Sequence, residues 1–353
     1  MTGMEMNLVL EDGAVFRGVS FGAKDEVCGW VHNDHRVVGY QEVLTDPDNA
    51  GCLVNMTYPL VGNYGTNEED FENDILYASS LIIKARSRIV SNWRATRPLD
   101  EMMRKENIVG VEGIDTRSLA IHIRQHGEMR GVIGSADKPV HTLLKKLKSW
   151  AEPLFIAADA VKPFSDTAFP RVALYNLGVR RSTRLQLEQL GCEIMDVPYS
   201  CSWEEIKALH PDGLVISNGP GHPEQMGKIL GEIKMAVDQL PVLGICLGAQ
   251  LLCLAAGGAV RRMKAGHHGG NYAVRSLDDG KVFMTTQNHS FVIENTANLP
   301  RLNVSHVNVN DGSIEGISSA DYAVMGIQFI PLPDEEGNPH VVFRRFVQAM
   351  KNK

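Results

Sequence analysis

The pentapeptide Gly-Ile-Cys-Leu-Gly at 244–248 lies between two apolar runs, an arrangement typical of a strand that turns sharply into a helix. Such a turn brings the residues two before and two after its centre close together, so both positions favour glycine, which has no Cβ to clash. The unsatisfied N–H groups at the start of a helix favour a thiolate. We therefore predict a nucleophile elbow at Cys246; the alternative is a buried core cysteine.

Strand-like and helix-like segments alternate regularly around this pentapeptide. Apolar runs that suit buried strands occur at 171–176, 193–197, 213–217 and 242–245. Segments with the apolar spacing of helices occur at 182–190, 225–239 and 249–256. A capping box at Ser202 and Glu205 opens a further helix. Because parallel strands need crossover connections, we predict an α/β domain with a mostly parallel sheet flanked by helices.

Ligands of such sheets bind at the carboxyl ends of the strands, where Cys246 and the loop 217–221 (Ser-Asn-Gly-Pro-Gly) both fall. The main-chain N–H of Gly219 and that of Leu247 would together form a two-donor oxyanion site for acyl transfer. A plain turn is the alternative for this loop. Further along, we predict β-rich hairpins, a last strand and a C-terminal helix, at 268–306, 322–330 and from 341.

Strands also dominate the first part of the chain. Two apolar runs around Asp12-Gly13 predict a β-hairpin over 7–17. Further strands are expected at 52–56, 78–84 and 108–111, and helices at 98–107, 116–125 and from 139. We predict a mixed α+β domain over 1–151, a linker over 152–170, where three prolines interrupt the periodicity, and the second domain over 171–353.

Composition excludes several classes of partner. The formal net charge of −7 comes without a lysine or arginine block, so we expect neither nucleic acid nor a membrane surface as a partner. The apolar stretch 241–260 is long enough to span a membrane, but its proline, glycines and Gln250 favour a buried strand, turn and helix. Because the N-terminus has no signal-peptide pattern and the six cysteines form no Cys-x-x-Cys pair, we expect reduced thiols and a cytoplasmic location.

Histidines offer candidate bases or ligands at His267, His268 and His289. The adjacent pair is followed by Gly-Gly and has no recognised metal-ligand spacing. We therefore predict no metal site.

At the level of longer motifs, the chain resembles the small (amidotransferase) subunit of carbamoyl-phosphate synthetase over nearly its whole length. In the first domain the resemblance depends on 39–47 (Gly-Tyr-Gln-Glu-Val-Leu-Thr-Asp-Pro), 57–65 (Thr-Tyr-Pro-Leu-Val-Gly-Asn-Tyr-Gly) and 113–117 (Gly-Ile-Asp-Thr-Arg). In the second domain it continues through 217–221, 266–269, 286–289 and 306–308. The motifs of the first domain are particular to this family.

This resemblance implies a class I glutamine amidotransferase domain that hydrolyses L-glutamine and passes ammonia to a large synthetase subunit. It makes Cys246 the nucleophile, and gives the oxyanion N–H groups to Gly219 and Leu247. Positions implied to hold glutamine, or to lie beside it, are Gly221, Gln250, Asn288, Ser290 and Phe291. No cofactor is implied in this chain, because ATP and Mg²⁺ belong to the large subunit. The product would serve arginine or pyrimidine synthesis.

The chain departs from the family's proton relay. Where the family has histidine and glutamate after the last strand, this chain has Ile330 and Leu332, and neither side chain can carry a proton. We expect this pair to be repacked as core, and glutaminase activity to be lost or severely reduced. Further departures affecting the same family site are Arg36, Ala249 and Ser290.

Two alternatives remain open. One is an active glutaminase with an unconventional base, for which His289 and His306 are the candidates. The other is a pseudoenzyme that binds an anionic metabolite through Arg36, or that acts only as a regulatory or structural partner.

Overall fold

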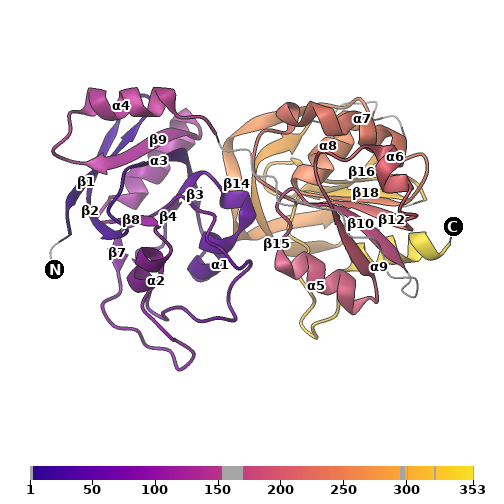
Figure 1. Cartoon of the computed structure of the whole chain (residues 1–353), viewed down its shortest axis with the longest axis horizontal. Coiled ribbons are helices and arrows are strands. Elements are labelled where there is room, and N and C mark those ends of the chain that lie inside the picture. Colours follow the sequence, from indigo (N-terminus) through magenta and orange to yellow (C-terminus); the bar gives the residue numbers. More distant parts are fainter. Residues whose placement is uncertain (1–2, 153–169, 295–298, 300, 322, 353) are drawn as a thin grey trace. The chain divides into compact units, whose positions relative to one another are not determined.

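The computed structural model describes residues 3–152, 170–294, 299, 301–321 and 323–352 (Figure 1). It divides into two compact units. The first comprises Met1–Pro153 with Met263–His268, and the second comprises Leu154–Arg262 with Gly269–Lys353. Most of the predicted linker 152–170 lies outside the described residues. The inclusion of Met263–His268 in the first unit was not anticipated from the sequence.

The first unit is built around a closed β-barrel with strand order β1-β2-β8-β6-β4-β3-β9 (Figure 1). Its strands are β1 (Glu5–Leu10), β2 (Val15–Gly22), β3 (Val27–Asp34), β4 (Cys52–Met56), β6 (Ser80–Ile83), β8 (Val109–Glu112) and β9 (Met129–Ser135). The predicted hairpin is confirmed, because Val9 pairs with Val15 in antiparallel register. The barrel is closed by the pairing of β1 with β9, in which Met6 lies opposite Ser135. Leu8, Val31 and Ile133 pack together in its core.

Helices and short segments surround this barrel. The helices are α1 (Tyr40–Thr45), α2 (Leu99–Lys105), α3 (Thr116–His126) and α4 (Val140–Ser149), with the 3₁₀ turn η1 (Pro47–Asn49). Strands β5 (Leu60–Val61) and β7 (Ala85–Arg86) pair in parallel and form a separate two-stranded sheet. The predicted mixed α+β character is therefore confirmed, whereas the strands β3 and β9, the short strands β5 and β7, and the helix α1 were missed from the sequence.

The second unit contains a nine-stranded sheet of order β11-β10-β12-β13-β18-β17-β15-β14-β16. Its strands are β10 (Arg171–Tyr175), β11 (Glu193–Val197), β12 (Gly213–Ile216), β13 (Val242–Ile245), β14 (Val260–Ser276), β15 (Val282–Ile293), β16 (Asn303–Asn308), β17 (Ile314–Ser318) and β18 (Val324–Ile327). The first five strands in this order are parallel, and β17 pairs with β18 in the antiparallel direction. The predicted α/β class with a mostly parallel core is confirmed.

Helices cover both faces of this sheet: α5 (Arg181–Gln189), α6 (Trp203–Lys207), α7 (Gly227–Ala236), α8 (Leu247–Ala255) and α9 (Val341–Lys351). All four residues of β12 are buried. Successive side chains of this strand pack in different hydrophobic clusters, one on each face of the sheet. Leu214 packs in the cluster that contains Ile229 of α7, while Val215 packs in the cluster that contains Phe343 of α9. Strands buried on both faces explain the continuous apolar runs in the sequence.

Two predicted boundaries were wrong. The expected helix 225–239 is a 3₁₀ turn, η2 (Pro223–Met226), followed by the shorter α7, because Pro223 occupies the first turn and favours a tight start. The expected strand 322–330 is shortened to β18. The apolar stretch 241–260 comprises β13, the turn, α8 and the start of β14. Within the described residues, no helix has the length and apolar character needed to cross a membrane.

Candidate active site

The predicted elbow at Cys246 is present as a sharp turn from β13 into α8. Cys246 has φ 50° and ψ −106°, a conformation that non-glycine residues rarely adopt. A Cβ added to Gly244 would lie 2.5 Å from the carbonyl of Gly248, and one added to Gly248 would lie 2.1 Å from the carbonyl oxygen of Ile216. Both glycines are therefore required by close backbone contacts, as the spacing predicts.

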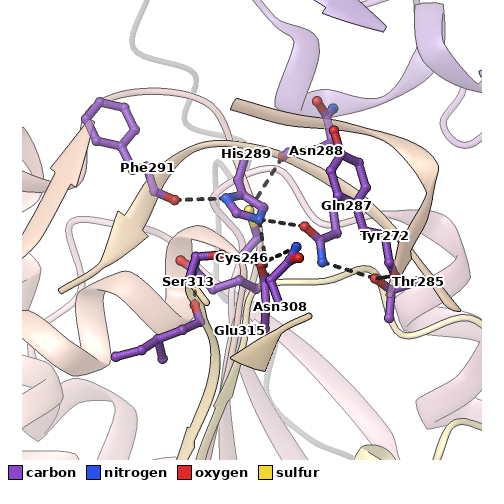
Figure 2. A network of polar contacts seen from close by, with 12 residues as sticks. Cys246, Tyr272, Thr285, Gln287, Asn288, His289, Phe291, Asn308, Ser313 and Glu315 are labelled. Atoms are coloured by element: carbon purple, nitrogen blue, oxygen red, sulfur yellow. Dashed lines mark hydrogen bonds and ion pairs between the residues drawn. The ribbon is translucent and has the colours of Figure 1, made fainter. Parts of the chain in front are cut away.

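The Cys246 thiol lies within the second unit and is only 5% exposed. Its Sγ donates to the main-chain carbonyl of Asn288 on β15 over 3.7 Å (Figure 2). The residue is also the N-cap of α8, so the N-terminal partial positive charge of that helix favours the thiolate. The catalytic role of Cys246 remains a prediction that this geometry suits.

The loop that follows β12 is held against the loop that follows β10. The hydroxyl of Ser217 accepts from the N–H of Leu177 over 2.9 Å, and the amide of Asn218 donates to the carbonyl of Gly178 over 2.8 Å. A Cβ added to Gly219 would lie only 2.1 Å from the carbonyl oxygen of Leu177. Glycine at 219 is thus required by this contact, while its assignment as an oxyanion donor stays a prediction.

The remaining predicted glutamine-binding positions lie in this loop and around the start of α8. Gly221 has φ 104°, a conformation that favours glycine, and Leu247 is the buried first residue of α8. Gln250 is 3% exposed, and its Nε2 donates to the carbonyl of Phe291 over 3.1 Å and to Oε1 of Gln328 over 3.0 Å. Ser290 is partly buried on β15. These hydrogen bonds join Gln250 of α8 to Phe291 of β15.

A buried polar network lies on β15 and β17 (Figure 2). Nδ1 of His289 lies 2.9 Å from the carbonyl oxygen of Phe291, and Nε2 lies 3.3 Å from Oε1 of Gln287 and 3.6 Å from Oε2 of Glu315. The side chains of His289 and Glu315 are 1% and 0% exposed. Glu315 also accepts from the hydroxyl of Ser313 over 3.1 Å. Glu315 was not predicted as a site residue, although an acidic residue within an apolar strand is a usable signal.

The second candidate base, His306 on β16, lies in an aromatic cluster. Its ring makes edge contacts with Phe283 and Phe329 at centroid distances of 6.0 and 5.6 Å, and its Nδ1 lies 2.9 Å from the hydroxyl of Ser305. Burial lowers the pKa of His306. The ring of His306 therefore contacts Ser305 and two phenylalanine rings.

The two positions at which the resemblance implies a proton relay, Ile330 and Leu332, follow β18. Ile330 is buried at 9% exposure, and its N–H donates to the carbonyl of Thr286 on β15 over 2.8 Å. Leu332 is 46% exposed, so the expectation that both side chains are repacked as core was wrong for Leu332. The backbone turns here: the Leu332 N–H donates to the Ile330 carbonyl over 3.0 Å, while Gln186 binds the intervening Pro331 carbonyl over 2.7 Å.

Arg36 lies in the first unit, after β3, and its charge is matched locally. Its guanidinium binds Asp34 through Nε at 2.9 Å and Nη2 at 2.6 Å, and the Asp34 side chain is fully buried. Burial alone would raise the pKa of Asp34, but the charge and hydrogen bonds of Arg36 hold it below its usual value. This pairing gives no support to Arg36 as an anion-binding residue.

A cysteine at the apex of a strand-to-helix turn, on a parallel sheet covered by helices, is a nucleophile elbow of an α/β protein. The class I glutamine amidotransferase family matches residues 173–349, which assigns this domain to that class. The carbamoyl-phosphate synthase small chain, CPSase domain, matches residues 8–133. The chain belongs to the carbamoyl phosphate synthase small-chain family.

Relatives support this assignment along the whole chain. The carbamoyl phosphate synthase small chain of Syntrophotalea carbinolica is 37% identical over 373 residues, covering 99% of this chain and 98% of the relative. The pyrimidine-specific small chain of Bacillus subtilis is 37% identical over 356 residues, covering 99% and 96%. The small chain of Archaeoglobus fulgidus is also 37% identical, covering 99% of each chain.

Proposed function

We propose that this chain is a carbamoyl-phosphate synthetase small subunit that binds the large subunit but whose own glutaminase is lost or severely reduced. The observation that carries the proposal is the chemical character of Ile330 and Leu332, which occupy the positions of the family's histidine and glutamate. Neither side chain can take the thiol proton or deliver a proton to the departing ammonia. Removal of catalytic triad members typically lowers the rate by about 10⁴ to 10⁶.

The rest of the amidotransferase framework supports a retained fold rather than a retained reaction. The elbow glycines, the strained Cys246 and the loop around Gly219 all remain. The glycines at 219, 244 and 248 are required by close backbone contacts, so they are expected in a folded chain even without turnover. The holoenzyme would then use free ammonia, with ATP and Mg²⁺ bound by the large subunit and no cofactor in this chain.

A working glutaminase with His289 as its base is the second candidate. The observation that favours it is the buried pair of His289 and Glu315. His289 directly follows Asn288, whose carbonyl accepts a hydrogen bond from the Cys246 thiol. However, both ring nitrogens of His289 already face oxygen atoms of neighbouring residues: Nδ1 faces the Phe291 carbonyl, and Nε2 faces the side chains of Gln287 and Glu315. These contacts hold the ring within the polar network of β15 and β17, and the loss of proton-carrying side chains at 330 and 332 makes the inactive alternative the better supported one.

The test compares nitrogen donors in the complete complex. The chain is purified with its large subunit, and carbamoyl phosphate formation is measured with ammonium and with glutamine. We expect ammonium to support synthesis, and glutamine to give only a background that is unchanged by Cys246→Ser. Glutamine-driven synthesis that Cys246→Ser abolishes would overturn the loss of glutaminase. Sensitivity of that activity to His289→Asn would identify His289 as necessary for it.

A further inference from the structure

The segment 87–97, here called the Trp93 loop, presents large apolar side chains to solvent in the first unit. Trp93 is 92% exposed and Ile89 is 75% exposed. A tryptophan side chain offers a large apolar contact area, and exposed apolar surface of this kind is a feature of sites that bind other proteins. None of the contacts described above for the amidotransferase site involves this loop.

Side-chain contacts hold the Trp93 loop against the segment 66–70. Nη2 of Arg94 binds Glu69 at 2.8 Å and Asp70 at 2.6 Å, and Arg97 binds Glu68. The hydroxyl of Thr96 donates to the carbonyl of Thr66 over 2.9 Å. These contacts come from residues on the C-terminal side of Trp93 and fix that half of the loop.

Backbone contacts fix the other half and the apex. The N–H of Ser91 donates to the carbonyl of Asn63 over 2.9 Å, and the N–H of Ala95 closes a turn onto Asn92 over 3.1 Å, with Trp93 inside this turn. Gly65 has φ 67°, and a Cβ there would lie 2.8 Å from side-chain atoms of Val90 and Ala95, so the loop packs directly on its neighbour. Trp93 is therefore displayed by a pre-organised turn, which reduces the entropy lost on binding.

The charge around Trp93 indicates what its partner presents. Between residues 84 and 97 there are five cations and no acidic residue. Arg86, Arg94 and Arg97 are paired with carboxylates. Exposed Arg88, adjacent to Ile89, has no ion-pair partner among the described residues. Tryptophan and arginine are the residue types that most often dominate binding energy at protein interfaces.

We infer that the Trp93 loop is a docking surface for the large subunit, which would present an apolar socket for Trp93 edged by carboxylates that pair with Arg88. This inference rests on the proposed function, since it takes the large subunit as the partner. The loop belongs to the domain that distinguishes carbamoyl-phosphate synthase small chains, residues 8–133, and not to the amidotransferase domain. A docking surface for a partner that is particular to this family is expected in the domain that is particular to this family.

The experiment measures the dissociation constant of the full chain and its large subunit by calorimetry. Trp93→Ala should weaken binding by at least about 30-fold, as expected of a central tryptophan, and Arg88→Glu by about 10-fold. Leu185→Ala, at a 52% exposed leucine in the second unit, is the matched control and should change binding less than 3-fold (about 0.65 kcal/mol). Because Trp93 is almost fully exposed, its removal should leave the melting temperature unchanged.

Two outcomes separate this inference from the proposed function. If wild type binds the large subunit and folded Trp93→Ala binds equally well, the docking surface is overturned while the proposed function stands. If wild type does not bind the large subunit, the proposed partnership itself is overturned. Sedimentation of the chain alone tests whether a second copy of the chain occupies the Trp93 loop. If the chain forms a homodimer that Trp93→Ala dissociates, the inference that the large subunit binds this loop is overturned.

Discussion

The main-chain N–H of Cys246 donates to the carbonyl of Ile327 over 2.7 Å. This bond joins the nucleophile elbow to the end of β18, three residues before Ile330. Cys246 and the proposed relay positions Ile330 and Leu332 therefore follow two neighbouring hydrogen-bonded strands, β13 and β18. The bond between Cys246 and Ile327 ties the position of the elbow to that of the segment that carries Ile330 and Leu332.

Restoration of the relay should restore part of the glutaminase. Ile330→His combined with Leu332→Glu should raise ammonia release from glutamine by about 100-fold, since positioned general acids and bases contribute at least that much. The strained turn at Cys246 is already in place to present the thiol. The assay measures ammonia from glutamine in the complex with the large subunit.

The control for this restoration is the same double variant with Cys246→Ser, which should release no more ammonia than wild type. Leu332→Glu alone should give no gain, because a carboxylate at 332 without the histidine cannot relay the proton. A folded double variant with wild-type ammonia release would contradict the prediction that Ile330 and Leu332 limit the glutaminase.

The close contact of Gly248 predicts a strong effect of adding a single methyl group. Gly248→Ala would place a Cβ 2.1 Å from the carbonyl oxygen of Ile216, so the strand or the elbow must move. We expect a loss of about 3 kcal/mol or more, which lowers the melting temperature by about 10 °C. The matched control is Gly231→Ala in α7, where nothing lies within 4 Å of the added Cβ and helix propensity favours alanine. Equal melting temperatures for the two variants would refute this account.

Local signals explain why the second domain could be predicted in most of its elements. The strands around Cys246 are continuous apolar runs, and the elbow is marked by the glycines at 244 and 248. In the first domain, α1 was missed because it has six residues and no apolar period, and its preceding Gly39 is held by the distant hydroxyl of Tyr64 over 2.6 Å. The closure of the barrel likewise depends on pairing between Met6 and Ser135, which no local pattern encodes.

At the candidate site, residue types were predictable but burial was not. Cys246 and its glycines follow from spacing, whereas the pairing of His289 with Glu315 depends on two strands brought together by the sheet. Leu332 was expected in the core on the basis of its apolar side chain alone. Its exposure is set by the turn around Pro331, whose carbonyl is bound by Gln186 from a helix almost 150 residues earlier.

Glu128 anchors the part of β14 that belongs to the first unit. Its Oε1 accepts from the N–H of Gly266 over 2.7 Å and lies 2.9 Å from Nε2 of His268, while its own N–H donates to the carbonyl of Lys264 over 3.0 Å. The side chains of Glu128 and His268 are 3% and 4% exposed. Glu128→Ala should therefore destabilise the first unit by about 3 kcal/mol, since it leaves buried donors without this acceptor.

Hydrogen exchange at the Gly266 amide provides the direct measurement of this anchor. Protection should fall strongly in Glu128→Ala and much less in Glu128→Gln, because glutamine keeps an oxygen that can accept from the amide. Unchanged protection at Gly266 in the alanine variant would show that the carboxylate does not hold this strand.

His340 should make the fold sensitive to acid. Burial, together with the nearby charges of His306, Arg344 and Arg345, lowers its pKa from 6.5 to about 4. Between pH 6.5 and pH 4 the unfolded chain binds a proton at His340 that the folded chain does not. The free energy of unfolding therefore keeps its full value above pH 6.5 and falls as the pH drops toward 4, by up to about 3 kcal/mol.

The variant His340→Asn removes this titration but keeps an acceptor for the N–H of Val342 at the start of α9. Denaturant unfolding at pH 7 and pH 4.5 should show a smaller loss for this variant than for wild type; His32, whose burial lowers its pKa to about 3, contributes equally to both. An identical loss in the two proteins would assign the acid sensitivity to other groups.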